Sequence, residues 1–431
     1  MSETSPNLDY FKWINGTNNE SRNFISRDMN NNLYVIGSSK SSSITINNTS
    51  YSRNASLTYG LYIVKFNTSG NVIWLKWFES NNDLSNELII ASPYSNYIYI
   101  TATAPITNTS ISNNGYTYGT SGNNNNSFVL KMSTNGDISW LNFLITNGGN
   151  YVYSSTIDIS GNLYVCGTAS ANNPVTLQFN GITYTKTLGQ DGFIIKINSD
   201  DSLNFIRWFI SSNGVTENLK NIIVDLNQNI YVSLTLYNTS SFNIDGNNYS
   251  TDISSNLING SFLIKFNSNN TFAWINNITG NSDTFVTDIK LDNDNNIILL
   301  GYTSATSINI KSNTYTKNTL VSTGIYLTKF DNNGNILRFI WIDGSSAEQS
   351  GVIVIDSINN IYITGYTVSG TLGINDISYN KVSGATKNSF VIKFNTNLDL
   401  RWIEWITGTN YNNVKIILSS SNEVYLAGIQ I

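Results

Sequence analysis

The chain has 431 residues, a formal net charge of -5 at pH 7, 12% charged residues and no histidine. Because its 23 Lys and Arg are spread along an acidic chain, we expect no nucleic-acid binding. The lack of histidine excludes imidazole general bases and His-bearing metal sites. The single cysteine, Cys166, excludes intrachain disulfides and thiolate zinc sites, and its apolar setting LYVCG predicts a buried, unreactive side chain.

The composition favours strands over helices. The chain is rich in Asn, Ile, Ser, Thr and Tyr, which suit pleated surfaces and tight turns. The residues that favour helices never gather into an amphipathic run. The N-terminus lacks the pattern of a signal peptide, and no apolar run has the length needed to cross a bilayer. We therefore expect an all-β protein without membrane contact, located in the cytoplasm or in a virus particle.

A unit of roughly 65 residues repeats along the chain. In chain order, its first element is an aromatic strand that alternates with polar residues. The second is a strand ending in Asp, followed by a turn and by a strand such as NLYVIG. The third is a longer connection with a short hairpin that ends in Tyr. The fourth is an apolar strand that ends in Lys and usually Phe. The aromatic strands begin at Tyr10, Trp74, Trp140, Phe205, Trp274, Phe339 and Trp402, and the Lys strands cover residues 62–67, 128–133, 193–198, 262–267, 326–331 and 390–395.

Four short antiparallel strands cannot bury both of their faces alone, so neighbouring units must stack. No atypical capping segment is visible at either end of the array, which favours a closed ring over a linear stack. We count seven hairpins of the Asp-ending strand with the strand that follows it. The sequence thus predicts a seven-bladed ring of four-stranded antiparallel blades, with the short Tyr hairpins outside the four strands.

The motif VDxxxNIYVxG followed by IKFNxxGNxxW resembles the bacterial seven-bladed β-propeller repeat, which is itself similar to NHL-type blades. The resemblance implies that the Asp-ending strand is innermost and the aromatic strand outermost. It also implies that YFKWI from Tyr10 closes the last blade, which lacks a Lys strand and would then have three strands. The expected single domain covers residues 1–431, in units 10–60, 61–126, 127–191, 192–260, 261–324, 325–388 and 389–431. The Asn-rich and Ile-rich composition resembles proteins of AT-rich genomes, including the giant DNA viruses that infect amoebae.

Five repeated aspartates could serve carboxylate chemistry such as glycoside hydrolysis, or could hold their turns through hydrogen bonds to backbone N–H groups. Because they recur at one position, we favour the structural role. Asp292, Asp294 and Asn296 have the alternating spacing of calcium-binding loops but lack the rest of an EF-hand, so we expect a solvated turn. The five aspartates are Asp28, Asp158, Asp225, Asp292 and Asp356.

Six repeated lysines could form a basic ring for an anion, but their position between apolar residues favours stems that lie along the blade face. Six repeated tyrosines in the short hairpins are the best candidates for a shared binding surface, although local packing is the stronger expectation. The lysines are Lys65, Lys131, Lys196, Lys265, Lys329 and Lys393, and the tyrosines are Tyr51, Tyr118, Tyr184, Tyr249, Tyr315 and Tyr379.

These observations predict a non-catalytic binding or scaffold protein, with no catalytic residue, metal or cofactor. Its partner would be another protein or another copy of the chain. The alternative is a lectin-like propeller that binds carbohydrate. A third interpretation is a glycosidase or lyase that uses carboxylates. An enzyme requires polar residues that break the repeat at one place, and Glu217, Glu348 and Glu404 are such departures without a visible paired arrangement.

Overall fold

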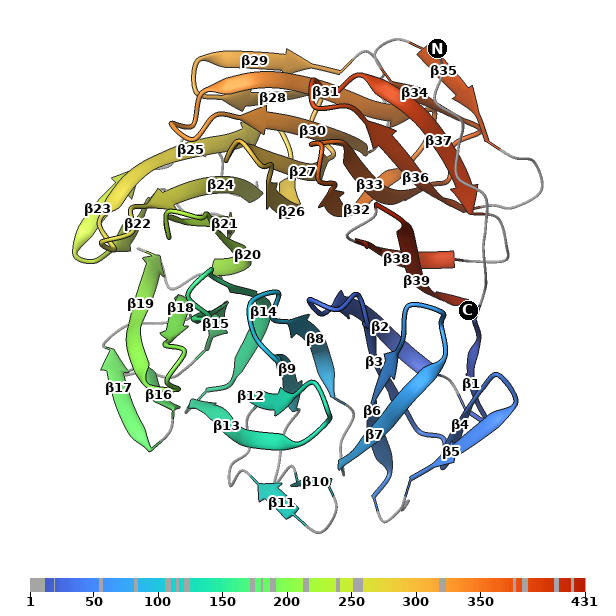
Figure 1. Cartoon of the computed structure of the whole chain (residues 1–431). Helices are drawn as coiled ribbons and strands as arrows, with labels where there is room; N and C mark the ends of the chain where they lie inside the picture. The colour runs from blue at the N-terminus through green and yellow to red at the C-terminus, as the bar shows by residue number, and fades with distance from the viewer. Residues whose placement is uncertain are drawn as a thin grey trace. The chain divides into compact units, whose positions relative to one another are not determined.

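All elements among the described residues are β-strands, and the strand pairs with a described register are antiparallel, as in β24 with β25 (Figure 1). The expected all-β fold is therefore confirmed, and the described residues contain no helix. None of these residues belongs to a helix with the length and apolar character needed to cross a membrane. The computed structural model describes residues 12–18, 20–53, 57–80, 84–104, 110–113, 116–119, 125–146, 148–170, 175–179, 181–186, 191–211, 217–237, 241–250, 259–317, 323–374, 377–381, 387–406, 411–419 and 422–430.

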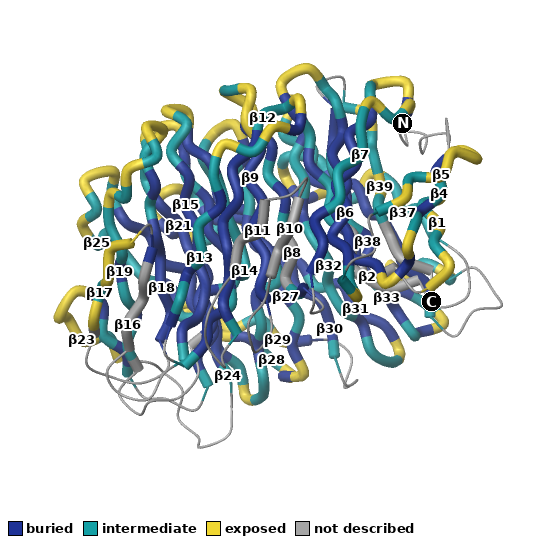
Figure 2. The backbone as a smooth tube through the Cα atoms, turned by 90° about the horizontal axis from the view of Figure 1, so that it is seen from below, coloured by how far each residue is buried: buried dark blue, intermediate teal, exposed yellow. Residues whose placement is uncertain are grey.

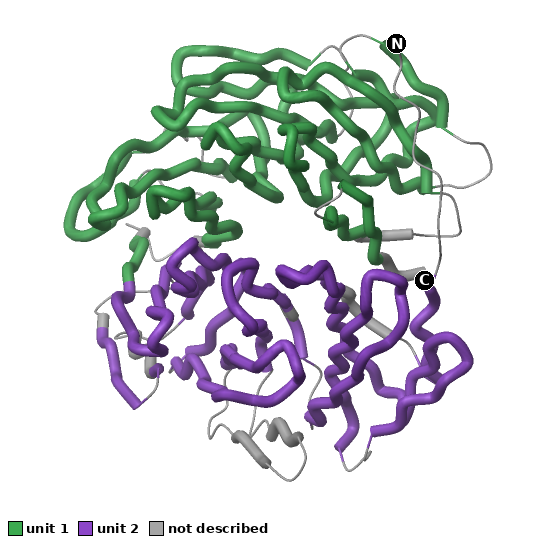
Figure 3. Tube along the Cα trace, viewed as in Figure 1, with its two compact units in different colours: residues 1–6, 207–431 green, residues 7–206 purple. Residues whose placement is uncertain are grey.

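The chain divides into two compact units, coloured separately in Figure 3. Unit 2 covers Asn7–Ile206, and Arg207–Ile431 belongs to unit 1. The boundary falls inside strand β19 (Leu203–Ser211).

Strands of unit 2 form sheets in which the order of neighbours follows the repeat. From one edge, each of the larger sheets runs from the Asp-ending strand or its equivalent through the strand after the turn and the Lys strand to the aromatic strand, and a three-stranded sheet at the N-terminus is separate. This order agrees with the expected one. The sheets are β2 (Glu20–Arg27), β3 (Leu33–Ser39), β6 (Tyr59–Phe66), β7 (Val72–Ser80), β10 (Ser110–Asn113) and β11 (Tyr116–Gly119); β8 (Ser85–Ala91), β9 (Tyr97–Ala104), β12 (Asn126–Ser133), β13 (Ile138–Thr146), β16 (Val175–Phe179) and β17 (Ile182–Lys186); β14 (Asn150–Ile157), β15 (Leu163–Ala169) and β18 (Asp191–Ile197); and β1 (Ile14–Gly16), β4 (Ser43–Ile46) and β5 (Thr49–Ser52).

Unit 1 repeats the same arrangement. Its strands β22 (Ser241–Ile244) and β23 (Asn247–Ser250) continue from β19. The other sheets are β20 (Glu217–Val224), β21 (Ile230–Tyr237), β24 (Asn259–Phe266), β25 (Phe272–Gly280), β28 (Ser307–Ile310) and β29 (Asn313–Thr316); β26 (Thr284–Leu291), β27 (Ile297–Thr303), β30 (Gly324–Phe330), β31 (Ile336–Gly344), β34 (Thr371–Ile374) and β35 (Ile377–Asn380); β32 (Glu348–Ile355), β33 (Ile361–Thr367), β36 (Asn388–Phe394) and β37 (Leu400–Ile406); and β38 (Tyr411–Leu418) with β39 (Val424–Gln430).

The short Tyr hairpins correct one expectation, because they do not lie outside the sheets. The hairpin β28–β29 follows β27 in the chain, yet β28 pairs with β25 of the preceding sheet, with Ile278 opposite Ile310. The aromatic strand would otherwise leave an open edge with unpaired backbone groups, which the hairpin covers. Four-stranded sheets are thereby extended to six strands, and each long connection reaches back to its neighbour.

Neighbouring sheets of one unit pack through their apolar faces. In unit 1 one buried cluster combines Leu263 and Ile278 of one sheet with Ile289, Leu299 and Tyr326 of the next. Strands enclosed by two neighbours are buried on both faces, as expected for stacked sheets. Figure 2 shows buried positions along the strands and exposed ones at many of the turns. The packing therefore leaves the turns as the main accessible features.

The N-terminal strand pairs as the outer strand of a repeat does. In β1, Ile14 lies opposite Ile46 of β4, which is the relationship that β25 has with β28. Residues 10 and 11 of the YFKWI motif lie outside the described residues. The Cys166 side chain is fully buried within β15, as expected.

Candidate functional site

The turns after the Asp-ending strands share one hydrogen-bond pattern, and we call these five segments the aspartate turns. In the turn that begins at Asp356, the Oδ1 atom accepts hydrogen bonds from the backbone N–H groups of Ile358, at 3.0 Å, and Asn360, at 2.8 Å. Asn359 has a φ of 64°, the left-handed conformation that ends a tight hairpin turn. Asn tolerates that conformation well. The aspartate turns are residues 28–32, 158–162, 225–229, 292–296 and 356–360.

The second carboxylate oxygen is used as fully as the first. Oδ2 of Asp356 accepts from the Asn360 amide at 2.7 Å and from the Tyr362 hydroxyl at 3.2 Å. The same Asn and Tyr contacts recur at Asp28, Asp158 and Asp225. Burial by itself would raise the pKa of Asp28, but these hydrogen bonds outweigh it and hold the pKa below its ordinary value. The geometry supports the structural role of the repeated aspartates.

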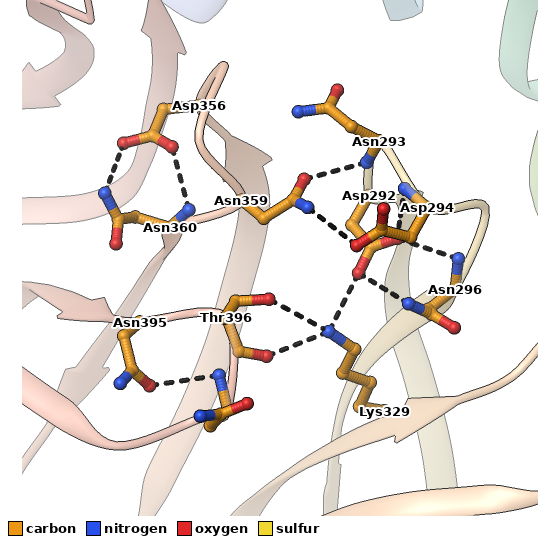
Figure 4. Close-up of polar contacts among 11 residues, drawn as sticks. Asp292, Asn293, Asp294, Asn296, Lys329, Asp356, Asn359, Asn360, Asn395 and Thr396 are labelled. Atoms are coloured by element: carbon orange, nitrogen blue, oxygen red, sulfur yellow. Dashed lines mark hydrogen bonds and ion pairs between the residues drawn. The ribbon is translucent and has the colours of Figure 1, made fainter.

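Asp292 is the exception, because its turn has Ile298 where the others have tyrosine. The Lys329 ammonium lies 2.8 Å from Oδ2 of Asp292 and donates a 2.8 Å hydrogen bond to the Thr396 carbonyl oxygen of the next repeat (Figure 4). In a turn that keeps its tyrosine, the Lys265 ammonium lies 5.3 Å from the Tyr231 ring centroid. It likewise donates to a carbonyl oxygen of the next repeat, that of Asn332, at 2.9 Å.

The repeated lysines are therefore contacts between sheets and not a basic ring. Five of them are buried, and their ammonium groups lie over tyrosine rings or near aspartates and turn carbonyls. Where a tryptophan lies opposite the lysine, it can share the same acceptor: Trp274 donates to the Asn332 carbonyl oxygen as Lys265 does. The buried lysines are Lys65, Lys131, Lys265, Lys329 and Lys393; Lys196 is half-buried.

The calcium hypothesis for Asp292, Asp294 and Asn296 finds no support. Oδ2 of Asp292 is paired with an ammonium group, and Oδ2 of Asp294 accepts from the Asn359 amide at 3.0 Å (Figure 4). Throughout the described ranges, no group of three or more His, Cys, Asp or Glu side chains is arranged to hold a metal ion. These oxygens bind nearby side chains of the protein and hold two neighbouring turns together.

The aspartate turns also carry exposed apolar side chains, which the sequence interpretation overlooked. A large apolar residue follows the aspartate within two positions in four of the five turns, and the turn at Ser92 has one at the same place. The pattern was visible in the sequence as DM, DI, DL and DSI. These apolar turn residues, with exposed fractions, are Met29 (55%), Tyr94 (46%), Ile159 (50%), Leu226 (61%) and Ile358 (71%).

The hairpin tyrosines that sequence reasoning proposed as a surface are half-buried. The Tyr315 ring stacks on Phe339 with centroids 4.0 Å apart, and Tyr249 lies 4.6 Å from Phe272. Part of the surface of each of these tyrosine rings is therefore covered by contacts within the protein. Tyr51, Tyr184 and Tyr379 are also half-buried, whereas the Tyr118 side chain lies outside the described residues.

Two of the other departures from the repeat, Glu348 and Glu404, have described side chains, and the carboxyl of Asp343 lies near that of Glu348. Glu348 is buried in β32, where it accepts a 2.9 Å hydrogen bond from the Thr367 hydroxyl and one from the Gly344 N–H at 3.1 Å. Glu404 is half-buried in β37, and the Glu217 side chain lies outside the described residues.

No model of a known protein family matches the chain. A curated protein of Acanthamoeba polyphaga mimivirus, named as an uncharacterised WD repeat-containing protein (L264), is 28% identical over 291 residues. The match covers 56% of this chain and 21% of the viral protein, so the chain spans about a fifth of that relative's length. WD repeats form the four-stranded blades of β-propellers. The similarity thus supports a β-propeller type of repeat in this chain.

Proposed function

We propose that the chain is a seven-bladed β-propeller that binds another protein through its apolar turn residues and carries out no reaction. The apolar turn residues carry this proposal: large apolar side chains recur one or two positions after the first residue of these turns and stay exposed. A single exposed apolar residue is ordinary, but a set in equivalent turns is typical of an interaction surface. The partner would present apolar side chains of its own.

The closed ring of seven blades is part of the same proposal. Seven hairpins of first and second strands occur: β2–β3, β8–β9, β14–β15, β20–β21, β26–β27, β32–β33 and β38–β39. The N-terminal strand, which pairs with a Tyr hairpin as an aromatic strand does, would be the outer strand of the last blade. Residues 1–431 would then form one domain.

The hydrogen bonding of the aspartates argues against catalysis at the most repeated carboxylates. Each accepts hydrogen bonds from its own turn, which occupies the carboxylate oxygens and leaves little capacity to contact a substrate. The similarity to a WD repeat-containing protein agrees with an interaction role, because such propellers serve as rigid platforms with variable turns.

The test is a comparison of three single variants in unit 1. The purified chain is used to capture a partner, which is then purified and measured directly. We expect Leu226→Asp and Ile358→Asp to weaken its binding at least tenfold, about 1.4 kcal/mol each. Leu337→Asp is the matched control, because Leu337 is also an exposed apolar residue, at 52%, but lies near the start of the aromatic strand β31.

All three variants should show unchanged circular dichroism and melting temperature, since the replaced side chains are exposed. Equal binding by Leu226→Asp, Ile358→Asp and the unmodified chain would reject the apolar turn residues as the interaction surface. If the captured partner is a second copy of the chain, the same variants should make it monomeric.

A further inference from the structure

One aromatic strand breaks the repeat at a single position. At the position opposite the first aromatic residue of the Lys strand, β25 has Asn277, whereas the equivalent position in the other described aromatic strands from β7 onward carries an aromatic ring. In β6–β7 that ring belongs to Trp77, which packs edge-on against the opposite Tyr62 with centroids 5.7 Å apart. The rings at the equivalent position are Trp77, Phe143, Trp208, Trp341 and Trp405.

The residue opposite Asn277 keeps its aromatic ring. Phe262 of β24 lies directly across from Asn277, as Phe128, Tyr326 and Phe390 lie across from their aromatic partners. Those three pairs have ring centroids 6.0, 6.3 and 6.2 Å apart. The Phe262 ring instead has a neighbour in Phe242, at 5.6 Å. The Asn277 amide therefore occupies a position at which the other repeats have a large aromatic ring.

A pocket of about 260 Å³ lies where the ring is missing, lined by Asn277, Thr279, Asn309 and Lys311. Thr279 lies opposite Asn309 in the β25–β28 pair, so their side chains share a face of the sheet. Asn277 is two positions away along β25, which places it on that same face, and Lys311 lines the pocket from the turn that follows β28. Thr279 is buried, while Asn309 and Lys311 are exposed, so the pocket has a closed floor and an open rim.

The opposite face of β25 and β28 packs against the rest of the protein. Ile278 and Ile310 are fully buried there, and the neighbouring Asn276 donates a 2.8 Å hydrogen bond to the Gly334 carbonyl oxygen. Two adjacent asparagines thus have different surroundings: Asn276 joins two repeats, and Asn277 faces the pocket.

We propose that this pocket binds one sugar ring. Two amides and a hydroxyl offer both donors and acceptors, and the ammonium group adds a donor, which suits a ligand covered with hydroxyl groups. The volume lies just below the range of about 300–1,000 Å³ of pockets for drug-sized ligands, which fits one ring and not an oligosaccharide. The site differs from the apolar turn residues, so it is independent of the protein-binding proposal.

The test titrates the whole chain with glucose, galactose, N-acetylglucosamine and glucuronic acid, followed by ligand-observed NMR. At least one of them should bind with a dissociation constant on the order of millimolar. Asn277→Trp restores the residue of the repeat and fills the pocket, so it should weaken that binding more than tenfold. Its melting temperature should equal or exceed that of the unmodified chain, because Phe262 regains an aromatic partner.

A second pair of variants keeps the proposal testable if Asn277→Trp does not fold. Asn309→Ala should weaken binding several-fold. Asn243→Ala is its control, because Asn243 has the same hairpin position in β22, where the neighbouring outer strand keeps Trp208. Both asparagines make hydrogen bonds within their own hairpins, so the structural cost is matched. The proposal is overturned if none of the four sugars binds, or if Asn277→Trp or Asn309→Ala binds like the unmodified chain.

Discussion

The Lys329 ammonium lies 2.8 Å from Oδ2 of Asp292, in the one aspartate turn whose tyrosine is replaced by isoleucine. In the turn at Asp28 the Tyr34 hydroxyl donates to Oδ2 at 2.9 Å, and the Lys65 ammonium stays 3.5 Å away. In both turns the side chains of the aspartate and of the lysine are buried. A lysine of the neighbouring strand has thus taken over the contact that tyrosine makes elsewhere, and Asp292 depends on it more strongly.

Lys329→Met should destabilise the chain more than the same change at Lys265. Removing Lys329 leaves the buried Asp292 carboxylate without its charge partner, which typically costs about 3–5 kcal/mol. Lys265→Met removes an equivalent bond to a carbonyl oxygen of the next repeat, but Asp225 keeps the Tyr231 hydroxyl at 3.1 Å. Urea denaturation of both variants measures the difference. Equal losses would contradict the special role of Lys329.

Asp356→Ala should cost more than Asp331→Ala, although the two aspartates bond to their turns alike. Asp331 accepts from the N–H groups of Asn333 and Asn335, at 2.9 and 2.7 Å, in an exposed turn. Asp356 is buried and also accepts from Tyr362. Because a buried donor left without an acceptor costs about 1–3 kcal/mol, we expect Asp356→Ala to lose at least that much more stability. Thermal unfolding monitored by circular dichroism gives the comparison.

Glu348 should make the stability depend on pH. Burial raises the pKa of its carboxyl from 4.5 to about 6, although hydrogen bonds from Ser369, Thr367 and Gly344 oppose the rise; the nearby Asp343 adds to it. Lys317 faces the same region, and burial lowers the pKa of its ammonium group. The folded chain therefore holds the Glu348 proton more tightly than the unfolded chain. Its stabilising contribution is complete below pH 4.5 and is lost as pH rises through about 6.

Glu348→Gln should remove that loss. Above pH 7 the variant should be more stable than the unmodified chain, by at most about 2 kcal/mol, and near pH 4 the advantage should vanish. Melting temperatures recorded between pH 4 and pH 8 test this, with the exposed Glu423→Gln as the control. Parallel curves for Glu348→Gln and the unmodified chain would show that Glu348 does not contribute to the pH dependence.

Cys166 should react with a thiol reagent only when the chain unfolds. Its side chain is fully buried, and its strand, β15, lies between the strands β14 and β18. Modification by a chromogenic disulfide reagent should therefore be slow under native conditions and complete in denaturant, since a buried thiol is shielded from attack. Rapid reaction of the folded protein would contradict this packing.

Much of the local structure could be predicted from the sequence, because strand and turn signals act over a few residues. The alternation of apolar and polar residues located the strands, and each repeated aspartate marked its turn, where Asp356 caps N–H groups two and four positions ahead. The order of strands within a sheet was implied by the resemblance to the β-propeller repeat. The pairing of β28 with β25 could not be predicted in this way, because a hairpin and its partner strand are separated by two further strands.

The sequence by itself determined the all-β repeat, the aspartate turns and the burial of Cys166, since these depend on residue type and short-range spacing. Only the tertiary structure decided that the lysines join neighbouring sheets, that the hairpins extend the preceding sheet, and that Asn277 faces a pocket. Those properties depend on contacts between side chains that are roughly 65 residues apart in the chain. The periodicity of the sequence shows that units repeat, but it does not show which side chains of two units come into contact. The apolar turn residues belong partly to each group. Their pattern is visible in the sequence, but only the tertiary structure shows that their side chains are exposed.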